Sequence, residues 1–129
     1  MARQLALVLA IIVGSGCSSA TEPPAFVGAY HAVAVNGAPL PAPRGTQSVV
    51  TAGSLQLMAD GSYALAIATR DATDPSIVGA DDMSGTWSEE GGTITLHFDG
   101  TSAVSATATY AGDQVTVQRA QNLYTFQRN

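Results

Sequence analysis

Residues 48–70 read SVVTAGSLQLMADGSYALAIATR, two runs of alternating apolar and polar residues that meet at Asp60-Gly61. In the second run Tyr63, Leu65 and Ile67 fall on one face, which is the period of a strand with one side buried. Asp-Gly between two such runs favours a two-residue type I′ hairpin, because both central positions of that turn need positive φ. The segment therefore predicts an antiparallel β-hairpin.

The same pattern continues along the chain. Short alternating runs occupy residues 26–35, 48–58, 62–70, 83–88, 93–98, 102–110, 114–118 and 122–128. Tight-turn signals stand between several of them, at Glu90-Gly91-Gly92, Asp99-Gly100 and Gly112-Asp113. No stretch has a sustained helical period, so the sequence predicts an all-β domain of eight strands.

The connections between the runs predict how the strands are arranged. Two connections are long, residues 36–47 and 71–82. In an up-and-down meander these are the first and third connections, so they share one end, the mouth, and the tight second, fourth and sixth turns form the floor. Eight strands can also close on themselves and remove exposed edges, with the first strand beside the last. We expect a small antiparallel up-and-down barrel over residues 26–129.

Closure would bring Tyr30 beside Arg128 at the floor, where the guanidinium can lie over the tyrosine ring. Gly28-Ala29-Tyr30 with a late Arg128 resembles the lipocalin floor, which has Gly-any-Trp on the first strand and an arginine packed across it. The runs VNGAPLP, GSLQLMADGSY and SGTWSEEGGTITLHF are also similar to short bacterial lipocalin-like lipoproteins of unknown function. The resemblance implies a lipocalin-like barrel in which Gly28, Tyr30 and Arg128 form a structural floor clamp.

The first 25 residues have the features of an export signal. Arg3 precedes an uncharged apolar run, Leu5 to Val13, which is far shorter than the roughly twenty residues of a membrane-spanning helix. Small residues then lead into Cys17, and this arrangement resembles the lipobox of bacterial lipoproteins. It implies a cleaved signal peptide at 1–16 and a lipidated Cys17 at the start of a flexible tether, 17–25. The alternatives are ordinary cleavage at Ser18-Ser19-Ala20, or a free or intermolecularly paired thiol.

Location and charge restrict the partners. Ser18, in place of the aspartate that favours inner-membrane retention, points to the outer membrane of a bacterial cell envelope. Without Arg3 the chain has four arginines against ten acidic residues, a net charge of −6. Nucleic acid and anionic lipid both need basic patches, so we expect neither as a partner of the domain. The expected partners are the membrane, through Cys17, and a small apolar ligand or an envelope protein.

Few residues suggest chemistry. We expect the side chains of the long connections and of the fifth turn to gather at the mouth as a ligand site: Arg44, Asp71, Asp74, Asp81, Asp82 and Asp99. Arg44 would anchor an anionic ligand there. His31 and His97 have no metal-ligand spacing and no evident catalytic partner, so we expect no metal, no cofactor and no enzyme activity. The larger apolar side chains are expected to fill the barrel: Tyr63, Leu65, Trp87 and Phe98.

Two functions fit these features. In the first, the barrel binds a small apolar or amphipathic ligand at the mouth between residues 36–47 and 71–82. In the second, a filled barrel is a non-enzymatic structural or protein-interaction module, as an inhibitor or assembly factor, and Ala64, Ala66 and Ala68 provide a flat outer face. The two differ in how completely side chains fill the interior.

Overall fold

The computed structural model describes residues 23–99 and 103–129, and these form a closed antiparallel β-barrel. The expected fold class is confirmed. The predicted signal peptide, Cys17, most of the tether and the turn at Gly100 lie outside the described residues. The strands are β1 (Gly28–Val35), β2 (Ala38–Pro39), β3 (Ala42–Arg44), β4 (Ser48–Leu57), β5 (Ser62–Asp71), β6 (Val78–Glu90), β7 (Thr93–Phe98), β8 (Val104–Ala111), β9 (Gln114–Arg119) and β10 (Asn122–Arg128).

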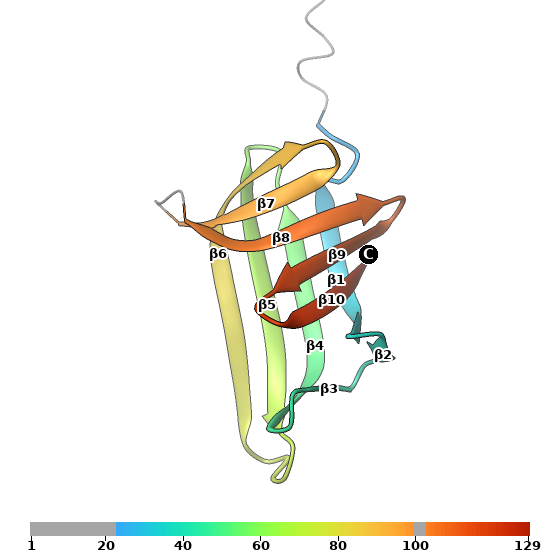
Figure 1. Cartoon of the computed structure of the whole chain (residues 1–129), viewed down its shortest axis with the longest axis vertical. Helices are drawn as coiled ribbons and strands as arrows, with labels where there is room; N and C mark the ends of the chain where they lie inside the picture. The colour runs from blue at the N-terminus through green and yellow to red at the C-terminus, as the bar shows by residue number, and fades with distance from the viewer. Residues whose placement is uncertain (1–22, 100–102) are drawn as a thin grey trace, which may run out of the picture.

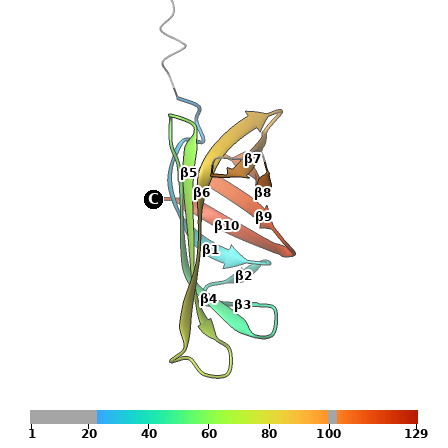
Figure 2. The ribbon, with the colours of Figure 1, turned by 90° about the vertical axis from the view of Figure 1, so that its left-hand side faces the viewer.

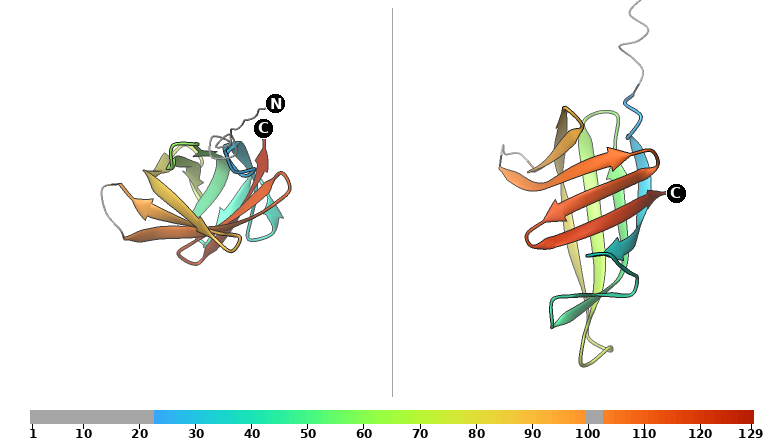
Figure 3. Two further views of the ribbon diagram at one scale, coloured as in Figure 1. Left: turned by 90° about the horizontal axis from the view of Figure 1, so that it is seen from above. Right: turned by 45° about the vertical axis from the view of Figure 1, so that its right-hand side comes forward.

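Strand β1 closes the barrel by pairing on both sides. Its first half pairs with β4, with Gly28 opposite Leu57 and His31 opposite Ser54. Its length from Tyr30 onward pairs with β10, with Tyr30 opposite Arg128. The remaining strands follow in sequence order around the ring from β4 to β10, so the first and last strands are neighbours as expected (Figure 3, left). The short strands β2 and β3 lie in the connection from β1 to β4.

The barrel is unequal in length. Strands β4, β5 and β6 form one layer, and β7 to β10 cross in front of its upper part (Figures 1 and 2). The sequence prediction for β6 was wrong at its start, because the strand begins at Val78 and not at residue 83. Residues 78–82 carry few large apolar side chains, but their backbone pairs with residues 66–70 of β5. The third connection therefore shrinks to residues 72–77.

One turn differs from its predicted type. At Asp60-Gly61, Gly61 has a positive φ of 92° and Asp60 does not, and the Gly61 amide donates to the carbonyl of Met58 at 3.1 Å. This is a longer turn with a glycine at its end, in place of type I′. The type I′ pattern occurs instead at Asn36-Gly37, with φ values of 52° and 85°, where it joins β1 to β2.

The interior of the barrel is filled by side chains. Tyr30, Tyr63, Tyr124 and Phe126 are all at most 2% exposed and occupy the space between the two layers. Smaller buried residues from every barrel strand except β10 pack around them: Ala32, Val35, Val50, Leu55, Leu57, Leu65, Ile67, Met83, Ile94, Leu96, Ala106, Ala108, Val115 and Val117. No polar or charged residue is buried within the described part of the chain. An eight-stranded barrel is just wide enough for such a packed core.

We predict that Gly85→Ala destabilises the barrel by about 2 kcal/mol or more, because overpacking a close contact forces the backbone to shift. A Cβ at Gly85 would collide with the carbonyl oxygen of His97 and lie 3.0 Å from the amide nitrogen of Asp99. Urea unfolding followed by tyrosine and tryptophan fluorescence measures the change. Ser84→Ala, at the exposed neighbouring position, is the control and should unfold near the wild-type midpoint. Equal midpoints for all three proteins would contradict the prediction.

Candidate functional site

The floor of the barrel is closed by aromatic side chains. Phe26, just before β1, is 2% exposed and packs edge-on against Trp87 at a ring separation of 5.0 Å. It also contacts Tyr110, with ring centroids 4.8 Å apart. The indole nitrogen of Trp87 donates to the carbonyl of Met58 at 2.9 Å, which fixes the ring over the floor. The segment that leads into β1 therefore acts as a plug.

Arg128 links this plug to the end of the last strand. Its guanidinium lies 4.9 Å from the ring centre of Tyr30 and donates to the carbonyls of Val27 at 3.0 Å and Ala25 at 2.6 Å. Gly28, with φ of 155°, leaves the space for it, since a Cβ there would collide with the guanidinium. The structure thus brings Gly28, Tyr30 and Arg128 together. Burial raises the pKa of Tyr30, against a smaller opposing effect of Arg128.

The mouth is closed by a charged cluster. Arg44 of β3 donates to the carboxylate of Asp81 at 2.5 Å and to the hydroxyl of Tyr124 at 3.3 Å. Arg119 of β9 lies 3.8 Å from the same carboxylate. Burial acts to lower the pKa of Arg44, and its bonds to Tyr124 and Asp81 outweigh this, so that its pKa is raised and it stays charged. Side chains from four strands therefore cross the opening.

A shallow hollow of ≈ 350 Å³ lies beside this cluster, toward the tip of the β5–β6 hairpin. It is lined by Arg44, Gln47, Ser48, Thr69, Arg70, Asp71, Ile77, Val78 and Gly79. Ile77 is 56% exposed on its rim. This is the place where the two long connections were expected to form a ligand site, and it lies outside the filled core.

Two of the predicted acidic ligands shape the connection between β5 and β6. The carboxylate of Asp71 accepts from the amides of Thr73 at 2.8 Å and Asp74 at 3.0 Å, and these bonds lower its pKa. The carboxylate of Asp74 accepts from the hydroxyl of Ser76 at 2.7 Å, which lowers the pKa of Asp74. Their oxygens therefore stabilise a turn, as Asp and Ser commonly do in such loops.

The structure does not bring Asp82 and Asp99 to the mouth. Asp81 pairs opposite the inward-facing Ile67, so its neighbour Asp82 must point to the outer face of the sheet. Asp99 follows the last residue of β7, Phe98, which pairs with Gly85, four positions further along β6 than Asp81. Strands in a closed barrel are tilted and staggered, so the connections on one side do not end at one level.

The two histidines and Phe98 were also singled out from the sequence, and the structure gives the surroundings of each. His31 Nδ1 lies 2.8 Å from Asn129 Oδ1, and His97 Nε2 lies 3.3 Å from Ser88 Oγ. Among residues 23–99 and 103–129, no three His, Cys, Asp or Glu side chains are grouped as metal ligands would be. Phe98 was expected inside the barrel, and this prediction was wrong: it is 45% exposed at the end of β7, beyond a register shift after Leu96.

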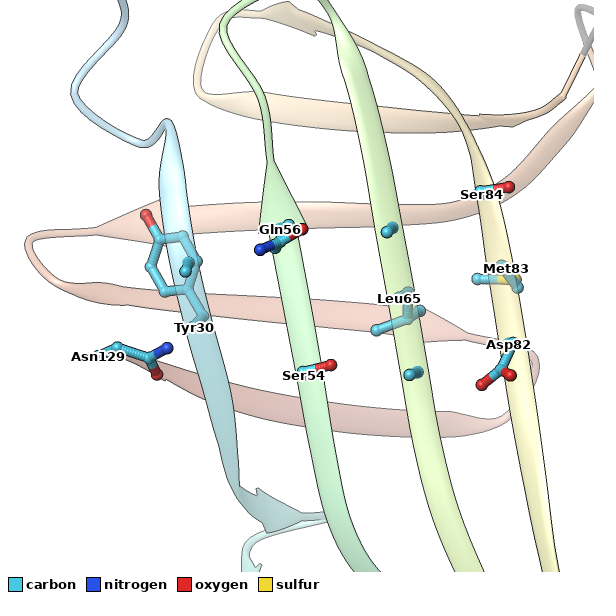
Figure 4. A pocket seen from close by; sticks show the side chains of 11 residues that line it. Tyr30, Ser54, Gln56, Leu65, Asp82, Met83, Ser84 and Asn129 are labelled. Carbon is cyan, nitrogen blue, oxygen red and sulfur yellow. The ribbon is translucent and has the colours of Figure 1, made fainter.

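The outer surface of β4, β5 and β6 is hollowed. A groove of ≈ 390 Å³ lies over these strands and the start of β1, and a second of ≈ 280 Å³ continues it toward the hairpin tip. The grooves share Ser54, Ala66 and Asp82, so they form one trough. Figure 4 shows the residues that line the first groove. We call this surface the alanine face, and its small side chains are Ala52, Ser54, Ala64, Ala66, Ala68, Ala80 and Ser84.

Sequence reasoning found part of this surface. It singled out Ala64, Ala66 and Ala68, because small residues alternate there with Leu65 and Ile67. It missed Ala80 and Asp82 as their neighbours, because the first five residues of β6 were assigned to a loop. It also missed Arg119 and Tyr124 at the mouth. The alternation of Tyr124 with Phe126 indicates that Tyr124 points inward, but which strand end carries Arg44 becomes clear only from the pairing.

Comparison with protein-family models, with curated proteins and with solved structures gave no significant match. Among the residues that the structure describes, no helix is long and apolar enough to cross a bilayer. A functional assignment therefore depends on the geometry of the barrel and its surface.

We predict that Arg128→Lys lowers the free energy of unfolding by about 2 kcal/mol, because lysine keeps the charge and cannot donate from two nitrogens to Ala25 and Val27 at once. Chemical denaturation of both proteins gives the difference. Arg70→Lys serves as the matched control, since the Arg70 side chain makes no hydrogen bond or ion pair within the described part of the chain. A control that loses as much stability as Arg128→Lys would contradict the assignment.

Proposed function

We propose that this chain is a lipid-anchored lipoprotein of the bacterial cell envelope whose filled, lipocalin-like barrel is a non-catalytic protein-interaction module. The proposal is supported by the contrast between the filled interior of the barrel and the hollow on its outer surface. Four large aromatic side chains fill the core, while the trough of the alanine face lies on the outside. A protein that binds through its exterior needs a rigid scaffold, and a closed barrel with a packed core provides one.

The anchor is proposed from the sequence. The apolar run before Cys17 and the small residues that lead into it support lipidation, and Ser18 supports the outer membrane as the destination. The described chain enters the barrel at the floor, where Ala25 contacts Arg128. An anchor on Cys17 would therefore attach to the barrel at its floor end, through the tether of residues 17–25.

A second candidate function is binding of a small amphipathic ligand at the mouth hollow. The observation that favours it is Arg44, whose contacts with Asp81 and Tyr124 both use one nitrogen of its guanidinium, beside the exposed apolar side chain of Ile77. Native mass spectrometry of the lipidated protein distinguishes the two. A small molecule that is released on denaturation supports the ligand site, and a bare lipoprotein mass supports the interaction module.

Cys17→Ser is expected to release the chain from membranes into the soluble fraction of the envelope and to abolish incorporation of labelled fatty acid. The physical reason is that each buried CH₂ contributes about 0.8 kcal/mol to membrane binding, so loss of the acyl chains removes the anchor. Cell fractionation and fatty-acid labelling provide the measurement, with Ser18→Ala as the control. A Cys17→Ser protein that remains in the membrane fraction would overturn the proposed anchor.

The interaction surface is tested by a photo-crosslinking amino acid placed in the full-length chain in bacterial cells. At Ser54, in the trough, we expect a discrete crosslinked protein band. At Thr107, an exposed outward-facing position on β8 across the barrel, we expect none. Both positions are exposed, so a difference between them reports a specific contact and not general accessibility. If Ser54 gives no adduct, or both positions give the same ones, the proposed interaction module is wrong.

A further inference from the structure

The alanine face carries a protrusion as well as a trough. Val78, the first residue of β6, is 77% exposed. It pairs directly opposite Arg70 of β5, so the two side chains share a face of the sheet. Two residues further in on each strand, Ala68 pairs with Ala80, and beyond them Ala66 pairs with Asp82 in the trough. Along β5 and β6 the surface therefore changes from a protruding end to a hollow one.

The charges follow the same division. Arg70 stands at the protruding end and Asp82 in the trough. Neither side chain makes a hydrogen bond or an ion pair to another described residue. Elsewhere Arg44 and Arg128, for example, are bound to carboxylates. The face thus presents one unpaired positive charge beside the protrusion and one unpaired negative charge in the hollow.

Building on the interaction role proposed for this face, we infer that its partner is a second copy of this chain. When two copies lie face to face with their β5 strands antiparallel, the Val78 of each enters the trough of the other. Arg70 of each copy then meets Asp82 of the other, because a two-fold interface makes every contact twice. On β5, Arg70 lies four residues from Ala66, the residue opposite Asp82, which is about 14 Å along the strand. The two-fold axis passes midway between them, near Ala68.

The small side chains at the centre of the face fit this arrangement. Around the axis, Ala66, Ala68 and Ala80 present no bulk that would hold the two sheets apart. Sheets packed face to face are usually about 10 Å apart, with their side chains interdigitated. The rows of alanine allow the two sheets to come at least that close together. The exposed Val78 of each copy fills the space above the small side chains of the other. Shape and charge on this surface are therefore both complementary to the same surface turned by half a rotation.

Charge reversal tests the inference in the full-length lipoprotein, purified in mild detergent and measured by native mass spectrometry. The wild type is expected to form a dimer. Arg70→Asp and Asp82→Arg each place like charges together at both contacts, and each should weaken the dimer by about tenfold or more.

Mixing the two variants restores opposite charges at both contacts, because the two substituted side chains meet at one contact and the two native side chains meet at the other. A heterodimer of the two variants should therefore form. Glu90→Arg, an exposed position on the β6–β7 hairpin, is the control for the change in net charge and should leave the dimer intact.

A monomeric wild type, dimerisation that neither variant weakens, or a mixture that stays monomeric would each overturn the inference. Circular dichroism and thermal unfolding of both variants establish that they are folded. The result at Ser54 separates this inference from the proposed function. An adduct with a different protein leaves the interaction module standing and excludes the second copy, whereas no adduct at all removes both.

Discussion

The closure of the sheet through β1 is the constraint on which the other features depend. Because β1 pairs with β4 along its first half and with β10 along most of its length, both of its backbone edges are occupied. The chain must then leave β1 between its two neighbours and cross the opening to begin β4. That crossing is made by β2 and β3, and it places Arg44 where it reaches Asp81 and Tyr124. The closed mouth is a result of the closed sheet.

A filled barrel needs small residues as much as large ones. Tyr30, Tyr63, Tyr124 and Phe126 occupy the centre, and glycine leaves room for the side chains of neighbouring strands. At Gly53, a Cβ would lie 2.8 Å from that of Ala32 and 3.2 Å from Ile67 Cδ1. Packing at this density makes the interior rigid and leaves the exterior as the place where shape can vary. Because of this dense packing, the core is rigid and the trough lies on the outer face of the barrel.

The strands with strong alternation were predictable, and the parts with weak alternation were not. Alternating apolar residues predicted β5 and β10, because burial of one face produces that period directly. The start of β6 was missed because Gly79, Ala80, Asp81 and Asp82 acquire their faces from pairing with β5 and not from their own hydrophobicity. The same omission hid the fact that Asp81 and Asp82 point to opposite sides of the sheet. Asn36-Gly37 did carry a recognisable type I′ signal, and it lay within a segment interpreted as an open loop.

The contact between the two ends of the domain has a topological consequence. The backbone amide of Asn129 donates to the carbonyl of Ala29 at 3.0 Å, and Arg128 reaches Ala25. In a ring of sequential neighbours whose ends meet, the position of the chain break is not dictated by the packing. A circular permutant that joins residue 129 to residue 25 by a short linker and opens at the exposed Gly91 keeps every strand pair. Such a permutant would carry its termini at a different point of the floor and leave the alanine face unobstructed.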